Sequence, residues 1–207
     1  MGQSSDSVER LNTGAGSEPT YDFEAKTQRW LDARPEELTA VMDPENVDQW
    51  CPSVFLHSEL LDRGQPDGLG MALRLHTKGF LPHSFFFVAR IVDVVPHRYM
   101  RVVVSGDFEG IADIFIVPDG AGSQFQLHWR IALMHPWLRP LVRALHWAFV
   151  PNHKWAVRHI CQLVEAEVHR RREPGDQIAQ ARATFPHNLV AFRNWQRRRA
   201  SAARWRY

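Results

Sequence analysis

Six apolar stretches follow one another between residues 54 and 134, with turn signals and no helical segment between them. Glycine, proline and aspartate gather in the separators, as in Gly64–Gly68 and Pro118–Gly122. The stretches are Val54–Leu61, Met71–Thr77, Ser84–Val94, Tyr99–Ser105, Phe108–Val117 and Gln124–Met134. Strands joined by short turns, with no crossover helix, pair as antiparallel neighbours. The sequence therefore predicts an antiparallel meander.

One further strand and two short helices are predicted ahead of the meander. Apolar and polar residues alternate over Tyr21–Lys26, which is the pattern of a half-buried strand. Pro35, followed by two glutamates, and the pair Asp43 and Pro44 are both helix-start signals. The sheet should thus have about seven strands, with the two short helices after the first strand.

The last strand of the meander is apolar on one face only, and a long helix follows it. Phe125, Leu127 and Trp129 alternate with polar residues. Apolar side chains then recur with the helical period between Trp137 and Val168. A proline inside a helix removes a hydrogen bond, so Pro151 predicts a kink or a break. These features predict an α+β fold in which a curved sheet wraps around a long C-terminal helix.

A strongly twisted antiparallel sheet curls, and a single helix does not fill its concave face. The unfilled space is expected to form a cavity, unless the many Phe and Trp side chains fill it. The residues expected to line the cavity are Trp50, Leu73, Leu75, Phe85, Phe87, Phe115, Leu127, Trp129, Leu145, Phe149 and Ile160.

Four short motifs and the order of elements carry a family resemblance over residues 21–169. The motifs are Asp43-Pro44-Glu45-Asn46 with Trp50, the hairpin Ser105–Gly110, Gly122-Ser123, and Pro151–Trp155. The sequence resembles the START-like (SRPBCC) superfamily in its polyketide cyclase/dehydrase and lipid-transport branch. The resemblance implies a helix-grip fold with a cavity for lipids, sterols, polyketides or other hydrophobic ligands. It implies neither a particular ligand nor a reaction, because the family shares no catalytic motif.

Three residues, His83, Asp113 and Arg90, are candidates for chemistry in such a cavity. His83 begins a strand and could act as a general base, or it could be an ordinary loop histidine. Asp113 lies in the middle of a strand, with Arg90 and Arg101 at comparable places on neighbouring strands. An inward Asp113–Arg pair would be a polar anchor for a ligand, whereas an outward pair would be a cross-strand ion pair. A shift of one residue in the register reverses the answer.

Metal and cofactor sites are not expected. No two histidines are four residues apart, and HExxH and cysteine–histidine clusters are absent. Glu165 and His169 have helical spacing that favours a surface ion pair. His153, near Pro151, could cap carbonyls at a kink and gate the end of the cavity, or it could be a structural histidine bonded to the backbone. The glycine patterns of nucleotide sites and the GxSxG motif of hydrolases are also absent.

The two cysteines, Cys51 and Cys161, exclude a disulfide scaffold and favour free thiols in a reducing compartment. No apolar run is long enough to span a membrane, and the first residues lack the pattern of a signal peptide. We therefore expect a cytoplasmic protein.

Charge divides the chain unevenly. From Arg170 onward there are ten arginines and two acidic residues, a net charge of +8, so the preceding part carries −6 of the total of +2. We expect a disordered arm at 1–19, a helix-grip ligand-binding domain at 20–171 and a basic aromatic tail at 172–207. No nucleic acid is expected to bind the main domain.

The tail has three interpretations. It could bind an anionic membrane surface, for which the candidate residues are Arg193, Arg197, Arg198, Arg199, Arg204 and Arg206. It could instead bind single-stranded nucleic acid or another partner. In the third interpretation its aromatic residues dock onto the acidic body and its arginines stay solvated.

Three functions remain open at this point: a binding module for a hydrophobic molecule, an enzyme resembling polyketide cyclases and dehydratases, and an interaction protein that uses its tail. An inward Asp113, Arg90 or His83 would favour the enzyme. A wholly apolar pocket would favour the binding module, and a filled interface between sheet and helix would favour the third function.

Overall fold

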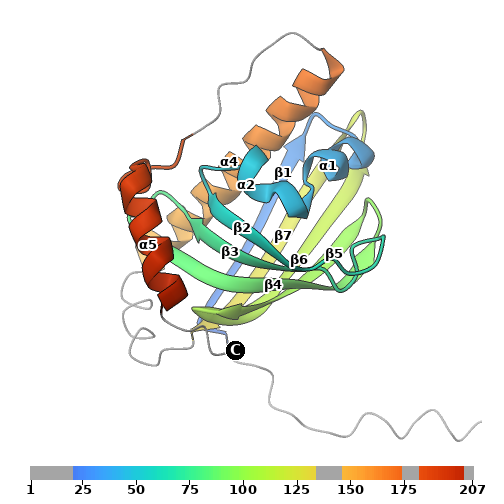
Figure 1. Ribbon diagram of the computed structural model, residues 1–207. Helices are drawn as coiled ribbons and strands as arrows, with labels where there is room; N and C mark the ends of the chain where they lie inside the picture. Colours follow the sequence, from blue (N-terminus) through green and yellow to red (C-terminus); the bar gives the residue numbers. More distant parts are fainter. Residues whose placement is uncertain (1–20, 134–145, 174–181, 203–207) are drawn as a thin grey trace, which may run out of the picture.

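The computed structural model describes residues 21–133, 146–173 and 182–202 (Figure 1). The predicted arm at 1–19 lies outside these ranges. The chain begins with β1 (Phe23–Leu31), α1 (Pro35–Val41), a 3-10 turn (Pro44–Asn46) and α2 (Val47–Trp50). Six strands follow: β2 (Phe55–Asp62), β3 (Ala72–Lys78), β4 (Ser84–Val95), β5 (Tyr99–Gly106), β6 (Phe108–Asp119) and β7 (Gly122–Leu133). Two helices, α4 (His146–Arg172) and α5 (Val190–Ala202), complete the described chain.

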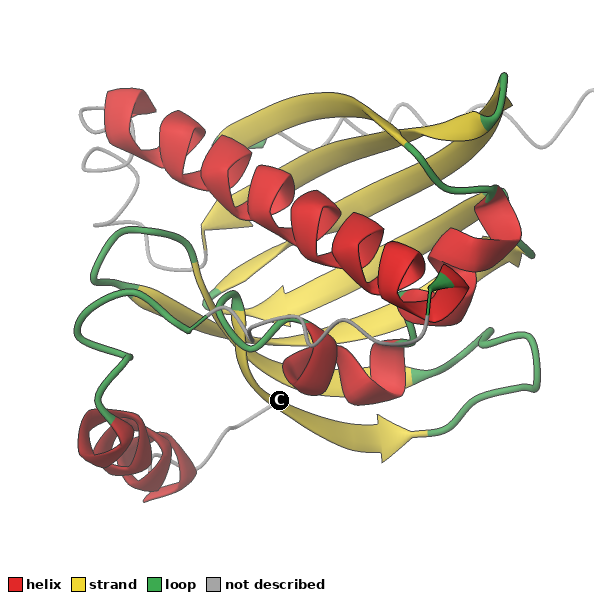
Figure 2. Cartoon of the chain, turned by 90° about the horizontal axis from the view of Figure 1, so that it is seen from above, coloured by secondary structure: helices red, strands yellow, loops and turns green. Residues whose placement is uncertain are grey.

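The seven strands form one antiparallel sheet in the order β1-β7-β6-β5-β4-β3-β2. The first strand lies beside the last, with Phe23 opposite Ile131 and Leu31 opposite Ser123. The sheet curves, and α4 lies across its concave face (Figure 2). The predicted meander, strand number and helix-grip arrangement are confirmed.

The two short helices begin where the sequence signals indicated. Pro35 is the first residue of α1, and the Arg34 N–H donates to Glu37 Oε2 over 2.8 Å. The Asp43 carboxylate accepts a hydrogen bond from the Glu45 N–H, which caps the 3-10 turn. The Trp50 indole N–H then donates back to the Asp43 carbonyl over 3.0 Å. This bond folds α2 back against the start of the turn and fixes Trp50 at its end.

The two halves of α4 have different surroundings. Val164 and Val168, in its second half, are fully buried in a cluster that includes Leu31 of β1 and Leu38 of α1. Side chains from its first half, such as Phe149 and Ala156, face the hollow of the sheet instead. The C-terminal half therefore anchors the helix, and the N-terminal half covers open space.

Of the kink or break expected at Pro151, the break does not occur. The helix runs from His146 through Pro151 without interruption. The proline removes only the hydrogen bond to the Trp147 carbonyl. Both residues lie on an exposed part of the helix, and Trp147 is 73% exposed, so water can reach that carbonyl. The predicted helical positions from Trp137 to Leu145 lie outside the described residues.

The described part of the C-terminal segment packs against the outer face of β3 and β4. The Lys78 ammonium donates to the Thr184 and Phe185 carbonyls, over 2.9 and 3.2 Å. His187 is fully buried and bonds Gln196, whose side-chain amide donates to Ser84 Oγ over 3.0 Å. The interpretation in which the tail docks onto the body thus holds for this segment.

Hydrogen bonds and ring contacts both contribute to this docking contact. Phe192 packs edge-on against His187, but Phe185 and Trp195 remain 69% and 50% exposed. The expectation that the aromatic residues dock is therefore met only in part. Of the described helices, none is long and apolar enough to cross a membrane.

Candidate functional site: a cavity beneath the long helix

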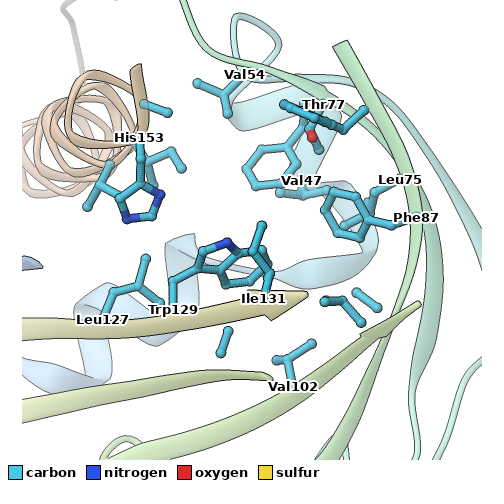
Figure 3. Close-up of a pocket in the computed structure, with 18 of the residues that line it drawn as sticks. Val47, Val54, Leu75, Thr77, Phe87, Val102, Leu127, Trp129, Ile131 and His153 are labelled. Carbon is cyan, nitrogen blue, oxygen red and sulfur yellow. The ribbon is translucent and has the colours of Figure 1, made fainter. Parts of the chain in front are cut away.

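A cavity of about 370 Å³ lies between the concave face of the sheet and α4 (Figure 3). Inward side chains from β1 and from β3 to β7 form its floor and sides, and the first half of α4 forms its roof. Its lining is almost entirely apolar, and no acidic side chain of the described residues contributes to it. Its volume lies within the range of small-molecule sites, about 300–1,000 Å³.

Aromatic rings keep this space from collapsing. Phe108 packs edge-on against Phe85, with ring centres 5.5 Å apart, and edge-on against Trp129 at 5.8 Å. The Phe87 ring also packs against Phe108, with ring centres 4.9 Å apart. These rings come from β4, β6 and β7, and they brace the curved sheet because each ring rests on another.

Most of the residues expected to line the cavity do lie in its wall. They are Trp50, Leu73, Leu75, Phe85, Phe87, Leu127, Trp129, Phe149 and Ile160. Leu145 lies outside the described residues. The structure also adds Phe108, Ile114 and Ile131 to the wall. Of these, only Ile131 could have been indicated by the sequence, because apolar and polar residues alternate cleanly along β7.

The assignment of Phe115 to the cavity is wrong. Phe115 lies on the outer face of β6, is 38% exposed and packs on the Tyr99 ring at 4.9 Å. Successive side chains of a strand point to opposite faces. Because Ile114 lines the cavity, its neighbour Phe115 must point away from it.

Asp113 shares this outer face, so the hypothesis of an inward polar anchor is wrong. Its carboxylate is only 4% exposed and accepts hydrogen bonds from Arg101 Nε over 2.7 Å and from the Tyr99 hydroxyl over 2.9 Å. Arg130 bonds its other oxygen. Burial would raise the pKa of Asp113, but the hydrogen bonds from Arg101 and Tyr99 and the charges of both arginines outweigh it and lower that pKa. The group is a cross-strand ion cluster.

Arg90 also lies away from the cavity. Its guanidinium donates to the Gly70 carbonyl over 2.9 Å and contacts the Asp62 carboxylate at 3.4 Å. It does not pair with Asp113. Its contacts tie the outer face of β4 to the loop between β2 and β3.

His83 is the one catalytic candidate that lines the cavity. It is exposed as well, so it lies at an opening, with its ring edge-on to Phe85 at 4.6 Å. Burial lowers the pKa of His83, against the opposing charge of Asp107. The residue therefore presents a neutral imidazole at the rim near pH 7.

Inside the cavity the polar groups are few. Figure 3 shows His153 of α4 pointing into the space, with Thr77 and Trp129 in the opposite walls. The buried Nε2 atom of His153 forms no hydrogen bond with any described residue, and its ring packs edge-on to Phe23 at 5.8 Å. Burial lowers the pKa of His153 to about 4, so the ring is neutral at pH 7. Within the described ranges no hydrogen bond joins this ring to the backbone, so the alternative of a structural histidine bonded to the backbone finds no support there.

The position of His153 could have been read from the sequence. It lies four residues after Phe149 and three and seven before Ala156 and Ile160, all of which line the cavity. This spacing places the four side chains on one face of a helix. The nearby Pro151 instead favours a role at the backbone, because a proline leaves a helical carbonyl without its donor.

A tight contact closes one end of the cavity. Asn152 Oδ1 accepts a hydrogen bond from the Leu81 N–H over 3.0 Å, which ties the loop after β3 to α4. A Cβ on Gly79 would lie only 2.2 Å from the same oxygen. A larger residue there would displace the Asn152 side chain and weaken its hydrogen bond to Leu81.

No metal-binding cluster is found among the described residues. Glu165 and His169 do not form the expected ion pair with each other. Instead, Glu165 accepts the Asp32 N–H over 2.8 Å, and His169 lies 3.4 Å from the Asp32 carboxylate. Both residues secure the start of the loop that leads into α1.

Comparison with known proteins gives a match in structure alone. No protein-family model and no curated protein sequence matches the chain. Among solved structures, the ZhuI aromatase/cyclase from Streptomyces sp. R1128 is 14% identical with a TM-score of 0.58, over 75% of this chain and 99% of that one. A START superfamily protein from Mycobacterium smegmatis is 21% identical with a TM-score of 0.55, over 72% and 98%.

A third similar structure is a norcoclaurine synthase from Thalictrum flavum, which is 13% identical with a TM-score of 0.53, over 73% of this chain and 96% of that one. Such identities carry the fold and not the function. The curved seven-stranded antiparallel sheet and the long C-terminal helix agree with the fold of these structures. The chain thus has the START-like, or SRPBCC, helix-grip fold.

Proposed function

We propose that this protein binds a hydrophobic small molecule in the cavity between its sheet and α4. The observation that carries the proposal is an apolar space of about 370 Å³ beneath the helix. Burial of apolar ligand surface against such walls drives binding without any specific polar contact. The shared fold of a START superfamily protein and an aromatase/cyclase supports the same class of ligand.

The volume of the cavity gives a scale for the size of the ligand. A water molecule occupies about 30 Å³ of liquid, so the space holds roughly a dozen groups of that size. A molecule with two or three aromatic rings or a medium-length alkyl chain is of this scale.

Native mass spectrometry of the purified protein, followed by organic extraction, tests the proposal directly. A bound hydrophobic molecule at one copy per chain is the expected result. Titration with the neutral fluorophore N-phenyl-1-naphthylamine gives an independent measurement. A ligand-free mass together with no uptake of the fluorophore would refute the proposal.

A pair of variants on one strand localises the binding. Ala89 of β4 lines the cavity, and Val88 beside it points to the outer face. Ala89→Phe places a ring in the space and should abolish fluorophore uptake. Val88→Phe adds a ring outside and should leave uptake unchanged. If Ala89→Phe and Val88→Phe take up the fluorophore equally well, the binding site lies elsewhere.

The enzyme alternative has less support. Two of its three candidate residues, Asp113 and Arg90, lie on the outer face of the sheet. His83 alone lines the cavity, at its rim. General acid–base chemistry needs a group within hydrogen-bond reach of the reacting atom, and one rim histidine provides little. We therefore propose binding and not polyketide-type cyclisation or dehydration.

A membrane surface is our second proposal, and the exposed face of the C-terminal segment favours it. Val190, Trp195 and Arg198 of α5 are all exposed, and their spacing places them on one side of that helix. The preceding Phe185 and Leu189 are exposed as well. Aromatic and basic side chains on one face suit the interface of an anionic bilayer. Of the other candidates, Arg204 and Arg206 lie outside the described residues.

Co-sedimentation with vesicles tests this second proposal. Wild-type protein should bind vesicles that contain phosphatidylserine and not vesicles of phosphatidylcholine alone. Trp195→Ser and Arg198→Glu should each weaken that binding, whereas the fluorophore affinity should not change. Equal binding to both kinds of vesicle, or none, would contradict the proposal.

We propose that the protein binds its hydrophobic ligand in the cytoplasm. Cys51 and Cys161 are both buried free thiols. Free thiols persist in a reducing compartment. Fractionation of the source cells with an antibody to the protein would test the location.

A further inference from the structure

We infer that the ligand is a neutral molecule with one hydroxyl or carbonyl group on an apolar body, and that His153 binds this group by a hydrogen bond. The inference rests on the proposed function, because it concerns the same cavity. It adds the chemical class of the ligand and the residue that selects it.

The first observation is the state of the imidazole. His153 projects from α4 into the cavity (Figure 3), and its Nε2 is sealed from solvent without a hydrogen-bond partner among the described residues. A buried polar atom left without a partner is costly, and native proteins rarely tolerate one without a reason. A ligand atom that bonds the ring removes this cost, whereas a pure hydrocarbon leaves it in place.

The second observation is that the cavity offers a charged ligand no counter-charge. Lys78 forms part of the cavity wall. Its ammonium, however, points outward and donates hydrogen bonds to the Thr184 and Phe185 carbonyls. No described arginine, aspartate or glutamate lines the space. A carboxylate or an ammonium group would therefore enter without compensation for its lost hydration.

A neutral imidazole suits an uncharged polar group. One ring nitrogen donates a hydrogen bond and the other accepts one. A ligand hydroxyl can donate or accept, and a carbonyl can accept, so either fits one tautomer of the ring. Two other cavity groups, the Thr77 hydroxyl and the Trp129 indole, form no hydrogen bond with a described residue either, and they are the competing anchors.

Competition of 2-naphthol, naphthalene and 2-naphthoate against bound N-phenyl-1-naphthylamine tests the inference at about pH 7.5. Wild-type protein should prefer 2-naphthol to naphthalene and bind the anionic 2-naphthoate weakly. In His153→Phe, the preference for 2-naphthol over naphthalene should fall about three- to tenfold, which is the effect of one ordinary buried hydrogen bond. Affinity for naphthalene should be kept or improved.

Three controls make the result specific. His159→Phe changes a histidine of the same helix that stacks on Trp155 outside the cavity, and it should leave the preference unchanged. His153→Gln keeps a hydrogen-bonding side chain and should retain part of the preference. By nuclear magnetic resonance, 2-naphthol should shift the ring nitrogen signals of His153, and naphthalene should not.

Two results would overturn the inference while the proposed function stands. In one, both neutral probes bind but the preference is the same in wild type and His153→Phe. In the other, the preference is lost in Thr77→Val or Trp129→Phe and kept in His153→Phe. If none of the probes binds wild-type protein, the proposed function fails, and this inference fails with it.

Discussion

Acid should destabilise this protein through His153, and the effect can be calculated from the structure. Burial lowers the pKa of His153 from 6.5 to about 4 in the folded protein. The unfolded chain therefore takes up a proton near pH 6.5, whereas the folded protein does so only near pH 4. The free energy of unfolding must fall as the pH drops through this interval.

Each pKa unit corresponds to about 1.36 kcal/mol, so the full difference of about 2.5 units is worth about 3 kcal/mol. Between about pH 7.5 and pH 5.0 the loss is about 2 kcal/mol, because the folded imidazole is still neutral at the lower value. Other histidines add to the loss in wild-type protein, since burial also lowers the pKa of His83, His159 and His187.

Comparison with His153→Gln separates this contribution from the others. Urea unfolding followed by circular dichroism gives the free energy of unfolding for both proteins across the pH range. The advantage of wild type over the variant should shrink by about 2 kcal/mol between pH 7.5 and pH 5.0. If the free energies of unfolding of the two proteins fall in parallel with pH, the ring is not buried as described. The same conclusion follows if titration by nuclear magnetic resonance shows that His153 takes up its proton near pH 6.5.

Three further predictions concern residues other than His153. Gly79→Ala should lower the free energy of unfolding by about 1–3 kcal/mol because its Cβ would meet the Asn152 side chain, and Asn152→Ala should restore part of the loss when the two are combined. Asp113→Asn should cost about 1–3 kcal/mol in urea unfolding, because it removes the charge that two arginines bond, and it should not change the affinity for 2-naphthol; a change in affinity would contradict its place on the outer face. Burial raises the pKa of Cys51 and Cys161 to about 12, so Ellman's reagent should react with them only after unfolding, and rapid labelling of the native protein would contradict this.

The sequence by itself determined the architecture. Turn residues between apolar stretches left only antiparallel pairing, and Pro35 and Pro44 marked the two short helices. Both signals are local, because they depend on backbone preferences of residues close together in the chain. The cavity followed from geometry, since one helix does not fill the hollow of a curled sheet.

The tertiary structure alone decided which way several side chains face. Asp113 and Phe115 alternate with Ala112 and Ile114, and no local pattern on β6 says which pair is inward. That choice is made by contacts far apart in sequence, such as the hydrogen bonds of Asp113 to Tyr99, Arg101 and Arg130. A strand shifted by one residue reverses both faces.

His153 illustrates the same division between sequence and structure. Its helical spacing with Phe149 and Ile160 can be seen in the sequence, but the lack of a hydrogen-bond partner for its Nε2 among the described residues cannot. Whether a buried polar atom finds a partner depends on every element that packs around it. The sequence therefore determined a curled sheet under one long helix, and only the packing of that sheet against α4 decided that an apolar cavity stays open there with a neutral histidine inside it.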